Sequence, residues 1–208
     1  MTVRRRTAIL ISGRGSNMDA LLAAAADPSY PATMVLVLAD RPEAAGLERA
    51  RAAGLPAYCL DRRAHGRDRA AHEATVDAVL REHGVELVCL AGYMRRLTPF
   101  LVERWAGRML NIHPSLLPAF PGLHTHQQAL AAGVKLHGCT VHLVTEAVDS
   151  GPILAQAAVP VLPDDTPDRL AARVLVQEHR IYPRALRHLA GGAAGWAEPA
   201  TAVSNPGA

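Results

Sequence analysis

Short apolar runs alternate along the chain with longer stretches in which apolar positions recur every three or four residues. The runs predict buried strands at 7–12, 33–40, 57–60, 85–92 and 108–113. The longer stretches predict helices at 17–26, 43–54 and 67–83, and a short helix after Thr98-Pro99. Buried strands separated by helices are typical of a parallel sheet covered on both faces. We therefore expect a three-layer α/β fold that binds ligands beyond the carboxyl ends of its strands.

The pattern changes after residue 134. Two apolar runs, 135–145 and 151–162, are joined by a connection too short for a crossover helix, so we expect an antiparallel C-terminal strand pair. A long C-terminal helix is predicted over 165–190, and Pro183 is expected to bend or end its first part. Residues 1–190 then form a single domain. The Gly- and Ala-rich residues 191–208 are expected to be a flexible tail.

Composition narrows the class of protein. Of the 208 residues, 50% are hydrophobic and 20% are charged, which is enough to build a core. A net charge of +3 gives no reason to expect a nucleic-acid partner, and no apolar run is long enough for a signal peptide or a membrane span. Cys59, Cys89 and Cys139 form no CxxC pair, which argues against a zinc site and fits a reducing cytoplasm. The sequence does not decide between monomer and homodimer.

The first predicted strand ends in a glycine turn, SGRGSN, at 12–17. Glycines at a strand-to-helix turn let the backbone approach a ligand closely, and free N–H groups at the helix start attract an anion. Ser16 and Asn17 can cap the helix or donate to phosphate oxygens. The spacing is neither GxGxxG nor a P-loop, so a mononucleotide or sugar phosphate fits better than a dinucleotide. A tight turn with a good cap and no ligand is the alternative.

Asn111, His113 and Asp149 are candidates for acid–base chemistry. Asn111 and His113 are two residues apart and share one side of a strand. Asp149 lies in the turn between the last two predicted strands. A carboxylate beside an imidazole fixes its tautomer, and an amide can hydrogen-bond an oxyanion. A histidine at a strand end is, however, more often a structural hydrogen-bonding group.

Two other kinds of chemistry lack their signatures. Ser115 is not in a GxSxG nucleophile elbow, so the sequence does not indicate a covalent acyl intermediate. The histidines are scattered and no HExxH is present, so no metal site is predicted.

Five stretches together resemble the phosphoribosylglycinamide formyltransferase family: ISGRGSN, AGYMRRLTP, NIHPSLLPAFPGLHTHQQAL, HGCTVHLVTEAVDSGPI and QEHRIYP. They extend over about residues 7 to 187 in the family's order. The resemblance implies a Rossmann-like formyltransferase fold. It also implies transfer of the formyl group of 10-formyltetrahydrofolate, as co-substrate, to the amine of glycinamide ribonucleotide in purine synthesis. No metal and no partner other than small molecules is implied.

The resemblance also assigns roles to residues. Asn111, His113 and Asp149 match the catalytic residues, and Asn111 also faces the folate. Binding of the ribonucleotide and its phosphate falls on Gly15, Ser16, Asn17 and Glu178. Binding of the folate falls on Arg69, Met94, Arg95, Arg96 and Leu97. Arg67 competes with Arg69 for its place, and Arg96 departs from the family, in which a hydrophobic residue is more usual there.

Three alternatives stay open. Methionyl-tRNA formyltransferases share HPSLLP and the three catalytic residues, but PGLHT follows here and only 18 residues remain after 190. Formyltetrahydrofolate hydrolases use water as acceptor and carry an extra N-terminal domain, whereas the first strand here begins near Thr7. A folate- or nucleotide-binding module without catalysis would hold ligand without turnover.

Overall fold

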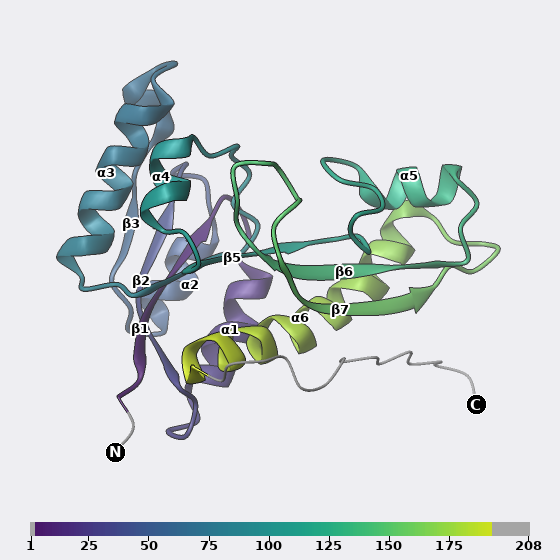
Figure 1. Cartoon of the computed structure of the whole chain (residues 1–208), viewed down its shortest axis with the longest axis horizontal. Coiled ribbons are helices and arrows are strands. Elements are labelled where there is room, and N and C mark those ends of the chain that lie inside the picture. The colour runs from purple at the N-terminus through teal and green to yellow at the C-terminus, as the bar shows by residue number, and fades with distance from the viewer. Residues whose placement is uncertain (1–2, 193–208) are drawn as a thin grey trace.

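The computed structural model describes residues 3–192, and its centre is one seven-stranded sheet in the order β3-β2-β1-β4-β5-β6-β7 (Figure 1). The strands are β1 (Arg5–Ile11), β2 (Ala32–Ala39), β3 (Ala57–Cys59), β4 (Leu87–Leu90), β5 (Met109–His113), β6 (Leu136–Leu143) and β7 (Ile153–Pro160). Strands β1 to β5 are parallel to their neighbours among these five strands. Strand β6 is antiparallel to β5, and β7 is antiparallel to β6. The predicted mostly parallel sheet with an antiparallel C-terminal pair is confirmed.

Helices cover both faces of this sheet. They are α1 (Ser16–Ala25), α2 (Gly46–Ala52), the 3-10 helix η1 (Arg62–His65), α3 (Arg69–Glu82), α4 (Pro99–Arg104), α5 (Thr125–Ala131) and α6 (Pro167–Gly191). Two separate apolar cores define the layers: α1, α2, α5 and α6 contribute to one, and α3 and α4 to the other. Alternate β1 residues point into each core, Ile9 and Ile11 into the first and Ala8 and Leu10 into the second. The predicted three-layer architecture is confirmed.

Helix α6 continues through Pro183, so the prediction that the proline could end the helix is wrong. A proline inside a helix removes one backbone hydrogen bond and costs about 3 kcal/mol. Ile181, Tyr182, Ala185 and Leu186, on both sides of it, are buried in the first core. Their burial more than offsets that cost, because each buried side chain of this size contributes roughly 1.5–3 kcal/mol.

Two short elements, α5 and η1, were not predicted. Helix α5 follows a segment with three prolines and begins after His124, whose backbone is left-handed with φ of 59°. The predicted tail lies outside the described residues from residue 193 onward. Within the described part of the chain, no helix is both long and apolar enough to cross a membrane.

Neighbouring parallel strands β1, β4 and β5 end at one edge of the sheet, and the chain reverses its strand order between β1 and β4. Ligands of open α/β sheets bind at such a switch point. The turns after the two strands are tied together there: Ser12 N–H donates to the Gly92 carbonyl at 3.1 Å, and Met94 N–H donates to Ser12 Oγ at 2.8 Å. The glycine turn and the segment 93–97 therefore share one rigid frame.

Candidate active site

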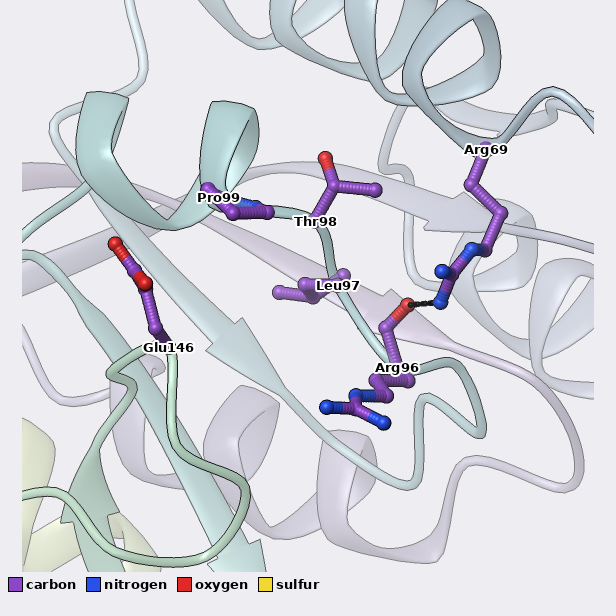
Figure 2. Close-up of a pocket in the computed structure, with 6 residues that line it drawn as sticks. All are labelled: Arg69, Arg96, Leu97, Thr98, Pro99 and Glu146. Atoms are coloured by element: carbon purple, nitrogen blue, oxygen red, sulfur yellow. Dashed lines mark hydrogen bonds between the residues drawn. The ribbon is translucent and has the colours of Figure 1, made fainter.

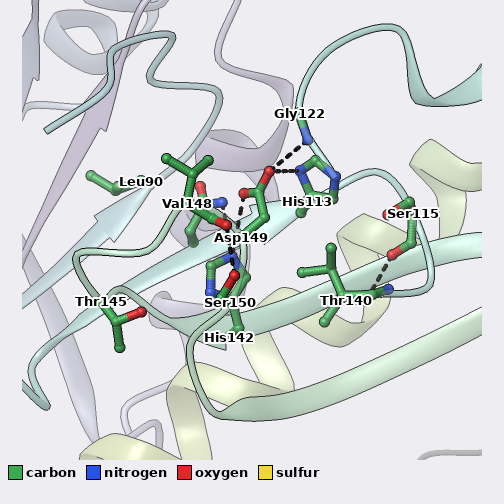
Figure 3. Close-up of polar contacts among 12 residues, drawn as sticks. Leu90, His113, Ser115, Gly122, Thr140, His142, Thr145, Val148, Asp149 and Ser150 are labelled. Carbon is green, nitrogen blue, oxygen red and sulfur yellow. Dashed lines mark hydrogen bonds and ion pairs between the residues drawn. The ribbon is translucent and has the colours of Figure 1, made fainter. Parts of the chain in front are cut away.

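His113 ends β5 and has an acceptor oxygen opposite each ring nitrogen. Its Nε2 lies 3.1 Å from the Phe120 carbonyl. Its Nδ1 lies 3.4 Å from Asp149 Oδ2 (Figure 3). Both side chains are more than nine-tenths buried. An imidazole ring donates to two acceptors only when both nitrogens carry hydrogen, and that ring is a cation. The geometry therefore suits a charged His113 that faces a carboxylate.

Asp149 comes from the connection between β6 and β7, which folds back over β5. Its backbone is left-handed, with φ of 53°, a conformation that aspartate tolerates better than most residues. Oδ2 also accepts a hydrogen bond from the Gly122 N–H at 2.8 Å (Figure 3). The loop after β5 therefore supplies a backbone donor to Asp149 and, through Phe120, a backbone acceptor to His113.

Asn111 is linked to the pair through His142 of β6. The two residues are opposite each other in the antiparallel β5–β6 pair, and Asn111 Nδ2 lies 3.2 Å from His142 Nε2. His142 Nδ1–H donates to the Leu143 carbonyl at 2.9 Å, so Nε2 is the acceptor for the Asn111 amide. Burial lowers the pKa of His142, which favours this neutral form.

This contact orients the Asn111 amide. One hydrogen of the NH₂ group points to His142, which fixes the plane of the amide. The second hydrogen of the group can then be donated to a ligand. His142 Nε2 is also 3.9 Å from Asp149 Oδ1, so Asn111, His142, Asp149 and His113 form one chain of contacts. The three predicted catalytic residues are thus brought together.

Other histidines lie outside this chain. His126 Nδ1 and His137 Nε2 are 3.1 Å apart, and burial lowers the pKa of His137 to about 4. No cluster of three or more His, Cys, Asp or Glu side chains suited to a metal ion occurs among residues 3–192.

The glycine turn is held in a narrow space. Gly15 precedes α1 with φ of 78°, and a Cβ built there would come within 3.0 Å of Met18 Cε and 3.3 Å of Gly46 Cα. The N–H of Gly46 in turn donates to the Gly13 carbonyl at 3.1 Å. Helix α2 therefore supports the turn from behind, and a side chain at Gly15 would be strained.

Asn17 and Glu178 meet across α1 and α6. Asn17 Nδ2 donates to Glu178 Oε2 at 2.6 Å, and both residues are buried. Neither Ser16 nor Asn17 caps α1 with its side chain, so the expected side-chain cap is absent. Burial raises the pKa of Glu178, although the Asn17 hydrogen bond opposes the shift. Asn17 Oδ1 is buried and has no hydrogen-bond partner among residues 3–192. Two predicted ribonucleotide-binding residues therefore form one polar contact beside the glycine turn.

A cavity of about 320 Å³ lies beside the segment after β4 (Figure 2). It is lined by Arg69, Arg96, Leu97, Thr98, Pro99 and Glu146. Glu146 belongs to the same connection as Asp149, so this cavity lies next to the loop that carries Asp149. Arg69 lies at the start of α3 and extends toward the segment after β4. Its Nη1 donates to the Arg96 carbonyl at 3.4 Å (Figure 2).

A second hollow lies beside the first, and two residues, Arg69 and Arg96, line both. The other residues that line the second hollow are Arg62, Gly66, Arg67, Met94 and Arg95. Of the two candidate arginines, Arg69 is therefore the one placed at both hollows. Arg96 is exposed, and its guanidinium points away from Arg69 (Figure 2). Arg95 Nε is buried and finds no hydrogen-bond partner in the described part of the chain. Cationic groups next to Leu97 fit a ligand that combines an apolar ring with carboxylates, as a folate does.

His142, the Phe120 carbonyl and the Gly122 N–H were not predicted as parts of the site. In the sequence, His142 is one of several scattered histidines without the spacing of metal ligands. The register of an antiparallel β5–β6 pair would have placed it opposite Asn111. Phe120 and Gly122 contribute backbone groups, which leave no residue-type signal.

Comparisons with known proteins support this description. Residues 5–186 match the formyl transferase family model. The phosphoribosylglycinamide formyltransferase of Escherichia coli is 45% identical over 88% of this chain and 86% of its own length. A structure of the enzyme of that name from Brucella melitensis is 55% identical, with a TM-score of 0.86 over 93% of this chain and all of that chain.

Some relatives are much longer. The bovine trifunctional purine biosynthetic protein adenosine-3 is 47% identical over 91% of this chain, which spans only 19% of the bovine protein. The chain thus corresponds to about a fifth of that relative. From the match over most of its length, the chain belongs to the formyl transferase family, in the phosphoribosylglycinamide formyltransferase branch.

Proposed function

We propose that the chain transfers the formyl group of 10-formyltetrahydrofolate to the amine of glycinamide ribonucleotide, a step of purine biosynthesis. The observation that carries the proposal is His113, which has Asp149 at one ring nitrogen and a backbone carbonyl at the other, next to the Asn111–His142 pair. The Escherichia coli and Bacillus subtilis relatives carry the name of this activity.

In the proposed reaction the ribonucleotide amine attacks the formyl carbon directly. A nitrogen–carbon bond forms, the carbonyl oxygen becomes an oxyanion, and the bond from that carbon to the folate nitrogen then breaks. His113 in its charged form and the Asn111 amide stabilise the oxyanion. Asp149 holds His113 as a cation and helps to pass the amine proton, directly or through water, to the departing folate nitrogen. The folate co-substrate supplies only the formyl group.

The two substrates have separate binding groups. Backbone N–H groups after Gly15, with Ser16 and Asn17, would bind the ribonucleotide phosphate at the start of α1. Glu178 would accept hydrogen bonds from sugar hydroxyls while it stays bonded to Asn17. Met94, Arg95, Arg96 and Leu97, with Arg69 and Asn111, would hold the folate in and beside the first cavity. We place the reaction in the cytoplasm, with the chain acting as a monomer or a homodimer.

A spectrophotometric assay with 10-formyltetrahydrofolate, with and without glycinamide ribonucleotide, tests the proposal. Product that forms only with the ribonucleotide is the expected result. Formate released without an acceptor would replace the proposal with a hydrolase, and formylation of methionyl-tRNA in a parallel reaction would replace it with a tRNA formyltransferase. Ligand binding without any turnover would indicate a binding module.

A further inference from the structure

One face of strands β5, β6 and β7 carries a row of polar side chains that starts at His113. His113 is opposite Thr140 in the β5–β6 pair, and Thr140 is opposite Gln156 in the β6–β7 pair. Side chains opposite each other on neighbouring strands point to the same face of a sheet. The next residues along these strands, Val141 and Ala155, point the other way, into the first core. The row therefore lies on the face that carries His113, and it ends at Gln156 on the edge strand.

The loop of residues 114–122 lies over this row and reaches the proposed catalytic pair. Its Phe120 carbonyl is 3.1 Å from His113 Nε2, and its Gly122 N–H donates to Asp149 Oδ2 at 2.8 Å. Both contacts come from backbone groups, so their positions depend on the path of the loop. Whatever holds the loop in place therefore affects both acid–base groups.

Hydrogen bonds join this loop to the far end of the polar row. Leu117 N–H donates to Thr140 Oγ1 at 3.0 Å, and Thr140 Oγ1 donates to the Ser115 carbonyl at 2.7 Å (Figure 3). Gln156 Nε2 donates to the Leu117 carbonyl at 2.8 Å and to Thr140 Oγ1 at 3.0 Å. Thr140 is fully buried and Gln156 is half-buried. The edge strand thus holds the loop through one amide and one hydroxyl.

Both of these groups use all the hydrogens that they can donate here. A threonine hydroxyl has one hydrogen and two lone pairs, and Thr140 Oγ1 donates once and accepts twice. The two hydrogens of the Gln156 NH₂ group go to two different acceptors. Neither group can rotate without leaving a buried partner unsatisfied, which is costly. Ser115 Oγ also donates to the Ala119 carbonyl at 2.7 Å, further along the loop. The network therefore favours one path of the loop.

We infer that Gln156 is a positioning residue for His113 and Asp149, and that it acts through Thr140 and the loop of residues 114–122. The inference rests on the proposed function and adds to it a residue that lies two strands away from His113 in the sheet. Gln156 fixes the part of the loop that it contacts, and the loop presents its backbone acceptor and donor to the catalytic pair.

Two substitutions remove the hydrogen bonds with little change in shape. Gln156→Met keeps the length of the side chain but lacks both donors, and Thr140→Val lacks only the hydroxyl. Each should lower kcat by roughly tenfold, because small displacements of catalytic groups are costly. KM for both substrates should change less than about twofold, because no substrate contact is removed. Steady-state kinetics, with thermal unfolding to confirm the fold, measure this separation of kcat from KM.

Three further variants separate positioning from general stability. Thr140→Ser keeps the hydroxyl and should keep near-normal kcat. Gln127→Met, at an exposed position of α5, is the matched control for Gln156→Met and should behave as the wild type. The double variant Gln156→Met/Thr140→Val should lose little more kcat than either single variant, because both substitutions act through the same loop.

Nuclear magnetic resonance of the histidine rings tests the same contact without turnover. The ring-nitrogen signals of His113 can be assigned by their loss in His113→Asn. They should shift in Gln156→Met, because the Phe120 carbonyl moves relative to Nε2, and they should stay in place in Gln127→Met.

Wild-type kcat or unchanged His113 signals in Gln156→Met would overturn the inference and leave the proposed function intact. A fall in kcat that only matches the loss of folded protein would also exclude a positioning role, since Gln156 would then act on stability alone. Absence of turnover in the wild-type protein would instead refute the proposed function. The His113 signals would in that case decide by themselves whether Gln156 positions the ring.

Discussion

At the scale of single residues, the site depends on which groups face His113 and Asn111. Asp149 and the Phe120 carbonyl face the two nitrogens of His113, and His142 faces the Asn111 amide. The two acceptors beside His113 favour a hydrogen on each of its ring nitrogens, and His142 accepts a hydrogen from the Asn111 amide. Substitutions here should therefore change the chemical step more than the fold.

Asp149→Asn should fold normally and lose turnover by roughly 10²–10³-fold. Asparagine tolerates the left-handed backbone at this position and can still accept from Gly122, but it removes the negative charge facing His113. Single-turnover kinetics and thermal unfolding measure the two effects. Asp164→Asn, in an exposed ion pair with Arg169, is the control and should match the wild type. A well-folded Asp149→Asn protein with near-normal turnover would rule out this role.

His142→Leu should lower kcat by roughly tenfold, because the Asn111 amide loses its acceptor and an unsatisfied buried group costs about 1–3 kcal/mol. KM for the ribonucleotide should change little. His83→Leu is the matched control, because His83 also donates from Nδ1 to a backbone carbonyl, that of Val79, away from the site. Equal kcat in the two variants would show that His142 does not orient Asn111.

At the scale of elements, α6 connects the core to both halves of the site. Tyr182 Oη lies 3.1 Å from the Leu90 carbonyl and 3.2 Å from the Leu110 carbonyl, at the ends of β4 and just before Asn111 in β5. One turn earlier, Glu178 contacts Asn17 of α1. The helix therefore sets the position of the strand that carries Asn111 and His113 and of the Asn17–Glu178 contact together.

Glu178→Gln should weaken ribonucleotide binding while leaving the empty protein at least as stable. Burial raises the pKa of Glu178 above 4.5, so the unfolded chain releases this proton first and ionisation lowers stability as pH rises from 4.5 to the folded pKa. Glutamine has no such penalty. KM for the ribonucleotide should rise by about tenfold, the effect of losing charge-assisted hydrogen bonds.

Urea unfolding at neutral pH and steady-state kinetics measure the two effects of Glu178→Gln. Glu103→Gln, at an exposed position, is the control. A Glu178→Gln protein that unfolds more easily than the wild type at neutral pH would contradict the expectation that ionisation of Glu178 lowers the free energy of unfolding.

Element by element, the sequence indicates most of the fold and part of the site. Apolar runs located the strands, because a strand buried on both faces leaves little room for polar residues. Helix α5 was missed because THQQALA is short and mostly polar, and its start depends on the left-handed His124. The spacing of two residues places Asn111 and His113 on one face of a strand. To predict that His142 lies opposite Asn111, one would need the register of β5 and β6, two strands far apart in sequence.

At the scale of the whole molecule, buried histidines couple stability to pH. His137 is fully buried on β6, and burial lowers its pKa from 6.5 to about 4. The unfolded chain takes up this proton more readily than the folded one, so stability falls as pH drops from 6.5 to about 4. Half-buried His126 and buried His142, whose pKa values burial also lowers, act in the same direction.

The free energy of unfolding should therefore decrease by about 3 kcal/mol across this pH range on account of His137 alone. Urea unfolding at several pH values measures the slope. His137→Gln should be less stable at neutral pH but show a shallower slope. His124→Asn, at an exposed histidine with a left-handed backbone, should keep the wild-type slope. An unchanged slope in His137→Gln would exclude this residue as the source.

The connection between β6 and β7 carries Glu146 at the wall of the first cavity and Asp149 at His113. Only two residues separate them, so inserting or deleting one residue between them would misalign both. Exchanged as a whole with a relative, the same segment would transfer its cavity wall and its carboxylate together. Recombination between relatives that exchanges residues 144–152 would therefore change the shape of the cavity and the carboxylate at His113 in one step.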